Sequence, residues 1–208
     1  MRKLLIATSN AGKVGQYRAG LGDVNIEMLS LKDVGLASIE ETGITFEENA
    51  RLKARNYFKQ SALFNNGQSL ACIADDGGLE IDYLGGKPGV YSRRWKNGTE
   101  DVTDQELIDF TIEQMKDVPK GKRGARFRMV MVFVDTNGKE HVVEAATEGY
   151  VPLEASKTIL PHLPFDSVLF IPQFNKIRSE LTHDEHEQVN QRLLAIKKLK
   201  PTIEQSLA

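Results

Sequence analysis

The sequence predicts an α/β protein with a mixed, partly antiparallel central sheet and flanking helices. Short apolar runs typical of strands are interspersed with segments of helical spacing, as expected where helices cover a sheet. Their succession has no regular βαβ rhythm, which argues against a doubly wound Rossmann fold. The turn residues Asn137-Gly138 separate two strand-like runs, and such a short connection requires antiparallel pairing.

The amino-terminal segment indicates a strand, a polar loop and a helix. Residues 3–8 form an apolar run that stops at the polar stretch 9–13. Loose helical spacing follows in the side chains of Val14, Tyr17, Ala19 and Leu21. Residues 24–29 alternate as a second strand should, and residues 32–43 are polar enough to form an exposed loop.

The clearest predicted helix begins near Thr45. The residues from Thr45 to Glu48 match a capping box, and helical spacing continues to about Phe64, where the turn residues 65–67 end it. Residues 70–74 then form a short, continuous apolar run, which is typical of a strand buried on both faces.

Strand patterns dominate the middle of the chain. Gly77-Gly78 is expected to end the preceding strand, residues 79–84 alternate as a new one, and residues 85–89 form a turn. Residues 125–135 and 140–147 flank the Asn-Gly turn and form the predicted hairpin.

Two further helices are predicted, one in the middle of the chain and one near its carboxyl end. Residues 101–116 show a polar face opposite an apolar one. An apolar stretch follows at residues 168–171, and the terminal helix runs from about His183 to Lys200, where Pro201 is expected to end it.

Charge and composition exclude several kinds of protein. The 208 residues include 27 Lys and Arg against 29 Asp and Glu, so bulk attraction to nucleic acid is not expected. No run approaches the about 20 apolar residues that span a bilayer, and the apolar run at the start is too short for a secretion signal. The single cysteine, Cys72, excludes an intrachain disulfide and suits a reducing cytoplasm. We expect one cytoplasmic domain over residues 1–208, without a nucleic-acid or membrane partner.

Two adjacent acids, Asp75 and Asp76, follow the apolar run 70–74 and precede two glycines. Carboxylates in this position suit Mg²⁺, which commonly takes one or two of them and completes its octahedron with water and phosphate oxygens. Because side chains alternate along a strand, only one of the two acids should face a given site. The alternative left open by this segment alone is that both acids accept backbone hydrogen bonds in a turn.

Other polar residues have both a functional and a structural explanation. Glu48 could supply a second metal ligand and Lys53 could neutralise phosphate oxygens, but Glu48 is also the acid of a capping box and Lys53 could be solvated. The loop 9–13 precedes a helix whose free N–H groups attract phosphate. It lacks the pattern of a Walker A loop, and N-capping by Ser9 or Asn10 is the simpler explanation.

Taken together, these segments resemble the inosine triphosphatase family, the pyrophosphatases of non-standard purine nucleoside triphosphates. The family's opening T/S-x-N-x-x-K loop is matched by residues 8–13. Its E-T/S-G-x-T-F-x-E-N-A-x-x-K-A motif is matched by residues 41–54. Its A-D-D-S-G-L-x-V-D-x-L-G-G-x-P-G-V-Y-S-A-R motif is matched by residues 74–94, with Gly77 in place of the serine and Arg93 in place of the alanine.

The carboxyl-terminal half resembles the family less closely. Where family members carry G-F-G-Y-D-P-x-F, this chain has residues 163–170, of which only Phe165 and Asp166 carry over. Only the arginine is retained in the later family motif K-x-x-x-S-H-R, whose counterparts here are His186, Asn190, Gln191 and Arg192.

The resemblance implies two lobes around a nucleotide cleft, a homodimer, and Mg²⁺-dependent hydrolysis of inosine, deoxyinosine and xanthosine triphosphates to the monophosphate and pyrophosphate. It implies that Glu48 and Asp76 hold Mg²⁺, and that Asp76 is the catalytic proton acceptor, with Asp75 in reserve. Arg192 would donate to O6 of the base, and Phe165 would stack on it. The implied substrate-binding residues are Thr8, Ser9, Asn10, Lys13, Lys53, Gly77, Phe165, Asp166, His186, Gln191 and Arg192.

Two rival interpretations stay open. The substituted base pocket could belong to a catalytically impaired protein that binds nucleotides without cleaving them. The chain could instead be a pyrophosphatase of the same broad superfamily that acts on other modified nucleotides, as Maf-like proteins do, and a substrate panel would separate the two activities. The intact acidic and lysine positions argue for retained catalysis.

Overall fold

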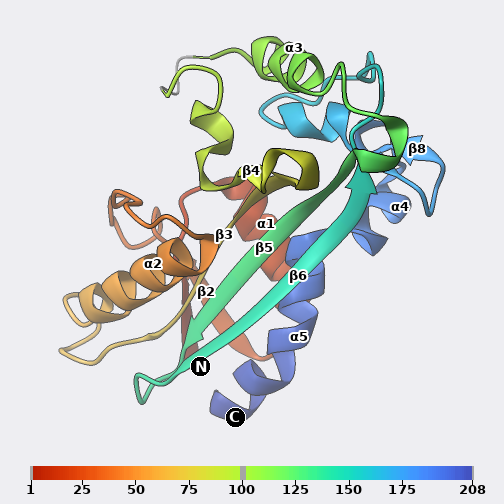
Figure 1. The fold of residues 1–208 in the computed structure, drawn as a ribbon. Coiled ribbons are helices and arrows are strands. Elements are labelled where there is room, and N and C mark those ends of the chain that lie inside the picture. The colour runs from red at the N-terminus through yellow and green to blue at the C-terminus, as the bar shows by residue number, and fades with distance from the viewer. Residues whose placement is uncertain (1, 99–101, 208) are drawn as a thin grey trace. The chain divides into compact units, whose positions relative to one another are not determined.

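The computed structural model of the chain describes residues 2–98 and 102–207 (Figure 1). The chain divides into two compact units. Unit 1 is made of three segments, namely residues 1–76, 129–145 and 191–208; unit 2 is made of two, namely residues 77–128 and 146–190. Each unit has its own buried apolar cluster. The two units correspond to the two lobes that the family resemblance implies. The nucleotide cleft and the single functional domain over residues 1–208 stay predictions.

The strands pair in the order β2-β1-β3-β5-β6-β7-β8, and β4 pairs with β3 outside this path. In unit 1, β1 (Arg2–Ile6) lies parallel to β2 (Ile26–Ser30) and also parallel to the start of β3 (Ala71–Ile81). Leu5 stands opposite Cys72 in the β1–β3 register. The residues of β1 and of the start of β3 that face each other in this register are apolar and buried. The continuous apolar run 70–74 predicted such a buried strand.

The predicted hairpin is confirmed. It consists of β5 (Gly124–Val134) and β6 (Glu140–Tyr150), which run antiparallel (Figure 1). Gly138 has a φ of +80° in the turn, a conformation that glycine adopts without steric cost.

Three short strands add antiparallel pairs: β4 (Lys87–Pro88) on β3, β7 (Phe170–Ile171) on β6, and β8 (Lys176–Ile177) on β7. With the parallel pairs of β1, they confirm the mixed, partly antiparallel sheet with flanking helices that the sequence predicts.

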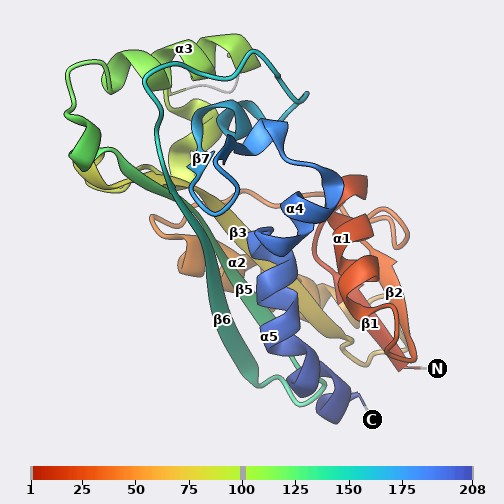
Figure 2. The same cartoon turned by 90° about the vertical axis from the view of Figure 1, so that its right-hand side faces the viewer.

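The core of unit 1 packs α1 (Ala11–Leu21) and α5 (Gln191–Ser206) on one face of β1 and β3, and the two helices lie side by side (Figure 2). Ala71 and Ile73 belong to this apolar cluster. Because strand residues alternate, Asp75 continues the face of Ile73, whereas its neighbour Asp76 belongs to the opposite face. The fold thus assigns the two acids to different sides of β3.

The second helix of unit 1, α2 (Phe46–Ser61), packs on β1. It begins with the predicted capping box, in which the Thr45 hydroxyl accepts from the backbone of Glu48 and the Glu48 side chain accepts from the backbone of Thr45. A capping box satisfies backbone N–H groups that the first turn leaves without partners, so the start of α2 is fixed.

Unit 2 contains α3 (Asp104–Gln114) and α4 (His183–Gln188). The expected start of α3 at residue 101 lies outside the described residues. Arg123 is buried in this unit and donates to the carbonyl oxygens of Val151 at 2.7 Å and Pro152 at 2.6 Å. Burial of the Arg123 guanidinium lowers its pKa.

Three predicted boundaries are wrong. Gly77-Gly78 does not end a strand, because β3 continues from Ala71 to Ile81. The terminal helix is not one element, because α4 ends before Val189 and α5 begins at Gln191. Nor does Pro201 end α5, which continues to Ser206 with Ile203 buried in the core of unit 1. In the part of the chain that the structure describes, no helix is both long and apolar enough to cross a membrane.

Alanine substitutions at two glycines should change the free energy of unfolding in opposite directions, because Gly149 lies at the close approach of β6 and β7 and Gly15 lies in open space. A β-carbon on Gly149 would lie 2.2 Å from the carbonyl oxygen of Phe170, so Gly149→Ala should lower the free energy of unfolding by about 1–3 kcal/mol. Gly15 is exposed in α1 with no atom within 4 Å of such a carbon, so Gly15→Ala should raise it by about 0.5–1 kcal/mol. Urea unfolding of both variants measures the difference. Equal midpoints would contradict the described β6–β7 contact.

Candidate functional site

The loop after β1 connects this strand to α1, whose residue Lys13 reaches Asp75 of β3. Thr8 Oγ1 accepts a hydrogen bond from the backbone nitrogen of Asn10 at 3.2 Å, and Asn10 Oδ1 accepts one from the backbone nitrogen of Lys13 at 3.1 Å. Asn10 is therefore the N-cap of α1, which confirms the structural interpretation of this loop. The cap leaves Thr8, Ser9 and Lys13 grouped at the amino end of α1, where the helix dipole favours negative charge.

Asp75 is the buried centre of this site. Its oxygen Oδ2 accepts hydrogen bonds from Lys13 Nζ at 3.0 Å and from Arg192 Nη2 at 3.1 Å, and Oδ1 accepts one from the Tyr17 hydroxyl at 2.7 Å. Burial raises the pKa of Asp75, but the charges of Arg192, Lys13 and Lys53 outweigh burial and hold the pKa well below its usual range. Asp75 is therefore an ionised carboxylate at neutral pH, and both of its oxygens are engaged.

Arg192 is the second residue of α5 and follows Gln191, with which the helix begins. Its Nη1 donates to Gln16 Oε1 at 2.6 Å while Nη2 donates to Asp75. Burial lowers the pKa of Arg192, but Asp75 and then Tyr17 outweigh burial and raise it above its ordinary value. The two contacts hold the guanidinium beside Lys13.

Asp76 is directed to the other side of β3, towards α2. Its Oδ2 accepts a hydrogen bond from Asn49 Nδ2 at 3.0 Å, and its Oδ1 lies 3.8 Å from Lys53 Nζ. Lys53 Nζ also donates to Glu41 Oε1 at 2.8 Å. Burial lowers the pKa of Lys53, but Asp76, Asp75 and Glu41 outweigh burial and raise it. The predicted alternation of the two acids is confirmed.

Glu48 acts structurally in α2. Its Oε2 accepts from the backbone nitrogens of Ile44 at 2.7 Å and Thr45 at 3.1 Å. Its other oxygen, Oε1, accepts no hydrogen bond from the residues described. The capping role expected from the sequence is therefore confirmed, and it leaves one oxygen of Glu48 available to a ligand.

The donor set restricts which metal ion could bind. Among residues 2–98 and 102–207, no three His, Cys, Asp or Glu side chains are grouped so that they could hold a metal. Mg²⁺ needs only one or two carboxylates when water and phosphate oxygens complete its octahedron. Asp76 accepts a hydrogen bond from Asn49, the residue after Glu48, so the two carboxylates come from neighbouring positions and have the oxygen chemistry that such an ion takes.

A polar cavity of about 90 Å³ joins several of these groups in unit 1. Its lining includes Thr8, Ser9, Lys13, Lys53 and Asp75. Whole-ligand sites usually measure about 300–1,000 Å³, so this cavity is of a size for phosphate groups rather than for a nucleotide. Two lysines at one small cavity can neutralise adjacent phosphate oxygens.

Unit 2 holds the predicted residues Asp166 and His186. Asp166 is 2% exposed, and its Oδ1 accepts a hydrogen bond from Arg178 Nη1 at 2.6 Å. Arg178 also lies over the ring of Phe127, with 4.7 Å from Cζ to the ring centroid. His186 Nε2 is 3.8 Å from Asp166 Oδ2. Asp166 is thus a buried acid paired with an arginine that the sequence motifs did not indicate.

Phe165 and Gly77 are placed differently from the expectation. The Phe165 ring is 6% exposed, with its centroid 6.4 Å from that of Trp95, inside the core of unit 2. The purine base of a nucleotide could stack on Phe165 only if the core residues that cover this ring, such as Trp95, moved away. Gly77 follows Asp76 within β3 rather than in a turn.

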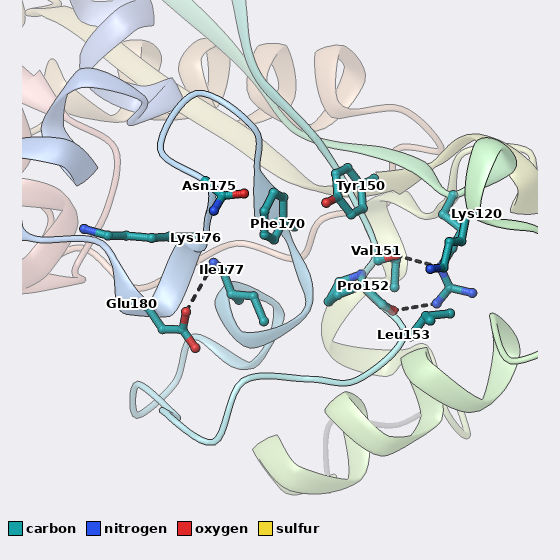
Figure 3. A pocket seen from close by; sticks show the side chains of 11 residues that line it. Lys120, Tyr150, Val151, Pro152, Leu153, Phe170, Asn175, Lys176, Ile177 and Glu180 are labelled. Carbon is teal, nitrogen blue, oxygen red and sulfur yellow. Dashed lines mark hydrogen bonds between the residues drawn. The ribbon is translucent and has the colours of Figure 1, made fainter.

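A larger cavity of about 520 Å³ lies in unit 2 (Figure 3). The rings of Tyr150 and Phe170 stack there with centroids 4.7 Å apart, and Lys120 and Lys176 also line the cavity. Its volume is in the range of small-molecule sites. None of the predicted site residues lines this cavity. The larger of the two cavities is therefore not the one that holds the predicted catalytic and binding residues.

Four contributors were missed by the sequence reasoning. Tyr17 lies one helical turn after Lys13, so helical spacing could have placed both beside the same acid. Asn49 directly follows Glu48 in the matched motif, which was a usable signal. No spacing pattern distinguishes the remaining two, Gln16 and Arg178.

Comparisons with known proteins identify the family of the chain. A sequence profile of the Ham1 family matches residues 4–202. The dITP/XTP pyrophosphatase of Escherichia coli (strain K12) is 38% identical over 201 residues, which cover 96% of each chain. The solved structure of a HAM1 protein from Coxiella burnetii has a TM-score of 0.86 and 27% identity, covering 99% of this chain and 100% of that one. A dITP/XTP pyrophosphatase from Mycobacterium abscessus has a TM-score of 0.75 and 32% identity, covering 96% and 99%.

The resemblance drawn from the motifs is thereby confirmed over both halves of the chain, including the half in which the base-pocket motifs are substituted. The profile match and the relative at 38% identity together show that the chain belongs to the Ham1 family.

Proposed function

We propose that the chain hydrolyses the triphosphates of non-standard purine nucleosides, namely ITP, dITP and XTP, to the monophosphate and pyrophosphate. The carrying observation is the pair of acids in β3. Asp75 faces Lys13 and Arg192 on one side, and Asp76 faces Lys53 on the other, all within unit 1. Relatives named dITP/XTP pyrophosphatases support the substrate class.

Cleavage between the α and β phosphates requires charge neutralisation, a positioned water and little covalent chemistry from the protein. We assign Lys13 and Lys53 to the phosphate oxygens, with Thr8, Ser9 and Asn10 presenting the loop at the start of α1. Lys53 would exchange its Glu41 partner for a phosphate oxygen, because Glu41 is the more exposed side of that ion pair.

Asp76 is the proton acceptor for the attacking water in this proposal. Asp75 is unsuited to that role because three donors occupy its two oxygens and its pKa is held well below the usual range. The Asp76 side chain is 14% exposed, compared with 3% for Asp75, so Asp76 is the acid that water can reach.

Mg²⁺ is the proposed cofactor, held by Asp76 and by the Glu48 oxygen that the capping box does not use. Bound there, the ion would supply positive charge to the phosphates. Asn49 keeps the Asp76 carboxylate oriented through the 3.0 Å hydrogen bond to Oδ2. The protein would thus contribute two carboxylates to the ion: Asp76 from β3 and Glu48 from the capped start of α2.

Base recognition is assigned to residues of the carboxyl-terminal half. We propose that Arg192 donates to O6 of a 6-keto purine, an acceptor that the amino group of adenine does not offer. The other proposed substrate-binding residues are Gly77, Phe165, Asp166, His186 and Gln191. We further propose that residues 1–208 act as one domain, as a homodimer and in the cytoplasm.

A substrate panel tests the function directly. With Mg²⁺, the protein should release pyrophosphate and monophosphate from ITP, dITP and XTP faster than from GTP or ATP, and EDTA should abolish release. The measurement is pyrophosphate release together with chromatography of the nucleotide product. Binding without release would favour the impaired nucleotide-binding protein, and cleavage of other modified nucleotides alone would favour a Maf-like activity.

Replacement of the proposed acceptor should stop the reaction without unfolding the protein. Asp76→Asn should lower kcat by roughly 10²- to 10⁴-fold, the range expected for the loss of general acid–base catalysis. Asp109→Asn changes an exposed acid of α3 and should keep full activity. Near-normal turnover in Asp76→Asn with an unchanged Tm would remove Asp76 from the reaction.

The base-reading role of Arg192 predicts a change in a ratio rather than in activity alone. Arg192→Ala should narrow the difference in kcat/KM between ITP and ATP by roughly 10- to 100-fold, the value of a hydrogen bond from a charged donor. Loss of the contact between Arg192 and Asp75 would lower kcat/KM for ITP and for ATP alike. The ratio of the two values therefore reports only on recognition of the base. An unchanged ratio would show that Arg192 serves only the phosphate side.

A further inference from the structure

The side chain of Tyr17 ends at the buried acid of the site. The residue is 0% exposed, and its hydroxyl donates to Asp75 Oδ1 at 2.7 Å. Both cations use the other oxygen of this carboxylate, with Lys13 Nζ at 3.0 Å and Arg192 Nη2 at 3.1 Å from Oδ2. The phenol therefore decides which Asp75 oxygen the two cations share.

The position of Tyr17 in α1 explains how this arrangement arises. Tyr17 and Lys13 are four residues apart in one helix, so their side chains lie on the same face, one turn from each other. One carboxylate thus receives a donor from each turn, which fixes both the rotation of the carboxylate and the register of α1 against β3. Arg192 then reaches Oδ2 from α5.

A carboxylate without the phenol would be free to rotate. A buried oxygen that loses its donor is costly, so Oδ1 would turn towards Lys13 or Arg192 and divide the two cations between its oxygens. Lys13 lines the 90 Å³ cavity, and Lys13 and Arg192 would no longer be directed by one shared atom.

We infer that Tyr17 is a positioning residue of the reaction, which orients Asp75 so that this carboxylate holds Lys13 in place for the triphosphate and Arg192 in place for the base. This inference rests on the proposed function. Tyr17 does not line the cavity and acts only through Asp75. Burial, followed by the charge of Asp75, raises the pKa of Tyr17 well above its ordinary value, so the phenol stays a donor over the whole working range of pH.

The competing explanation is that Tyr17 only fills the core. Its ring belongs to the apolar cluster of unit 1, so a packing role alone is physically reasonable. The two explanations differ in what the hydroxyl does, because Tyr17→Phe keeps the ring and removes only the donor.

The test compares Tyr17→Phe with Ser61→Ala. Ser61 is also 0% exposed in unit 1, and its hydroxyl accepts from Leu70 N at 2.7 Å and donates to Phe58 O at 2.6 Å, away from the cavity lining. Both variants lose a buried hydroxyl and should lower Tm. Only Tyr17→Phe should raise KM for ITP with Mg²⁺, on the order of tenfold, with a smaller change in kcat.

A binding measurement separates this inference from the proposed function. Calorimetry with inorganic tripolyphosphate should show that Tyr17→Phe weakens the Kd on the order of tenfold, whereas Ser61→Ala leaves it unchanged. If the wild type cleaves no triphosphate but binds tripolyphosphate with this pattern, the proposed function fails and the role of Tyr17 stands. Equal KM and Kd in Tyr17→Phe and wild type, or no tripolyphosphate binding by the wild type, would overturn the role of Tyr17.

Discussion

A buried carboxylate is the constraint around which unit 1 is arranged. Ionised Asp75 is costly to bury unless cations and donors surround it, and removal of one partner from such a group typically costs about 3–5 kcal/mol. Its partners come from α1 and α5, so both helices must pack on one face of β3. Their packing is close, since a β-carbon on Gly20 of α1 would lie 2.7 Å from Ile196 Cγ2 of α5. Apolar burial and charge pairing therefore require the same placement of the two helices.

The elements that local patterns determine were predictable, and the exceptions have physical causes. The capping box at Thr45 and the Asn-Gly hairpin depend on neighbouring residues and were found as predicted. The glycine pair after Asp76 did not end β3, because the pairing of this strand with β5 and β4 outweighs the low strand propensity of glycine. Pro201 did not end α5, because burial of Leu199 and Ile203 on either side offsets one lost backbone hydrogen bond.

The sequence motifs selected the residues of the candidate site but did not indicate which of them contact one another. Motif matches selected Lys13, Lys53, Arg192 and both aspartates, yet the structure determines which cation meets which acid. Asn49 and Asp76 are 27 residues apart and Arg192 and Asp75 are 117 apart, so no periodicity of the sequence could pair them. The pairing of Asp166 with Arg178 in unit 2 was equally invisible, because it depends on how a buried 3-10 helix packs.

The three-segment construction of unit 1 has a consequence for biosynthesis. Asp75 leaves the ribosome long before Arg192, and at about 5–20 residues per second the delay is on the order of ten seconds. During that interval the nascent chain holds β1, β3 and α1 without the helix that covers their apolar face. The contact between Asp75 and Arg192 can therefore form only after α5 has been synthesised.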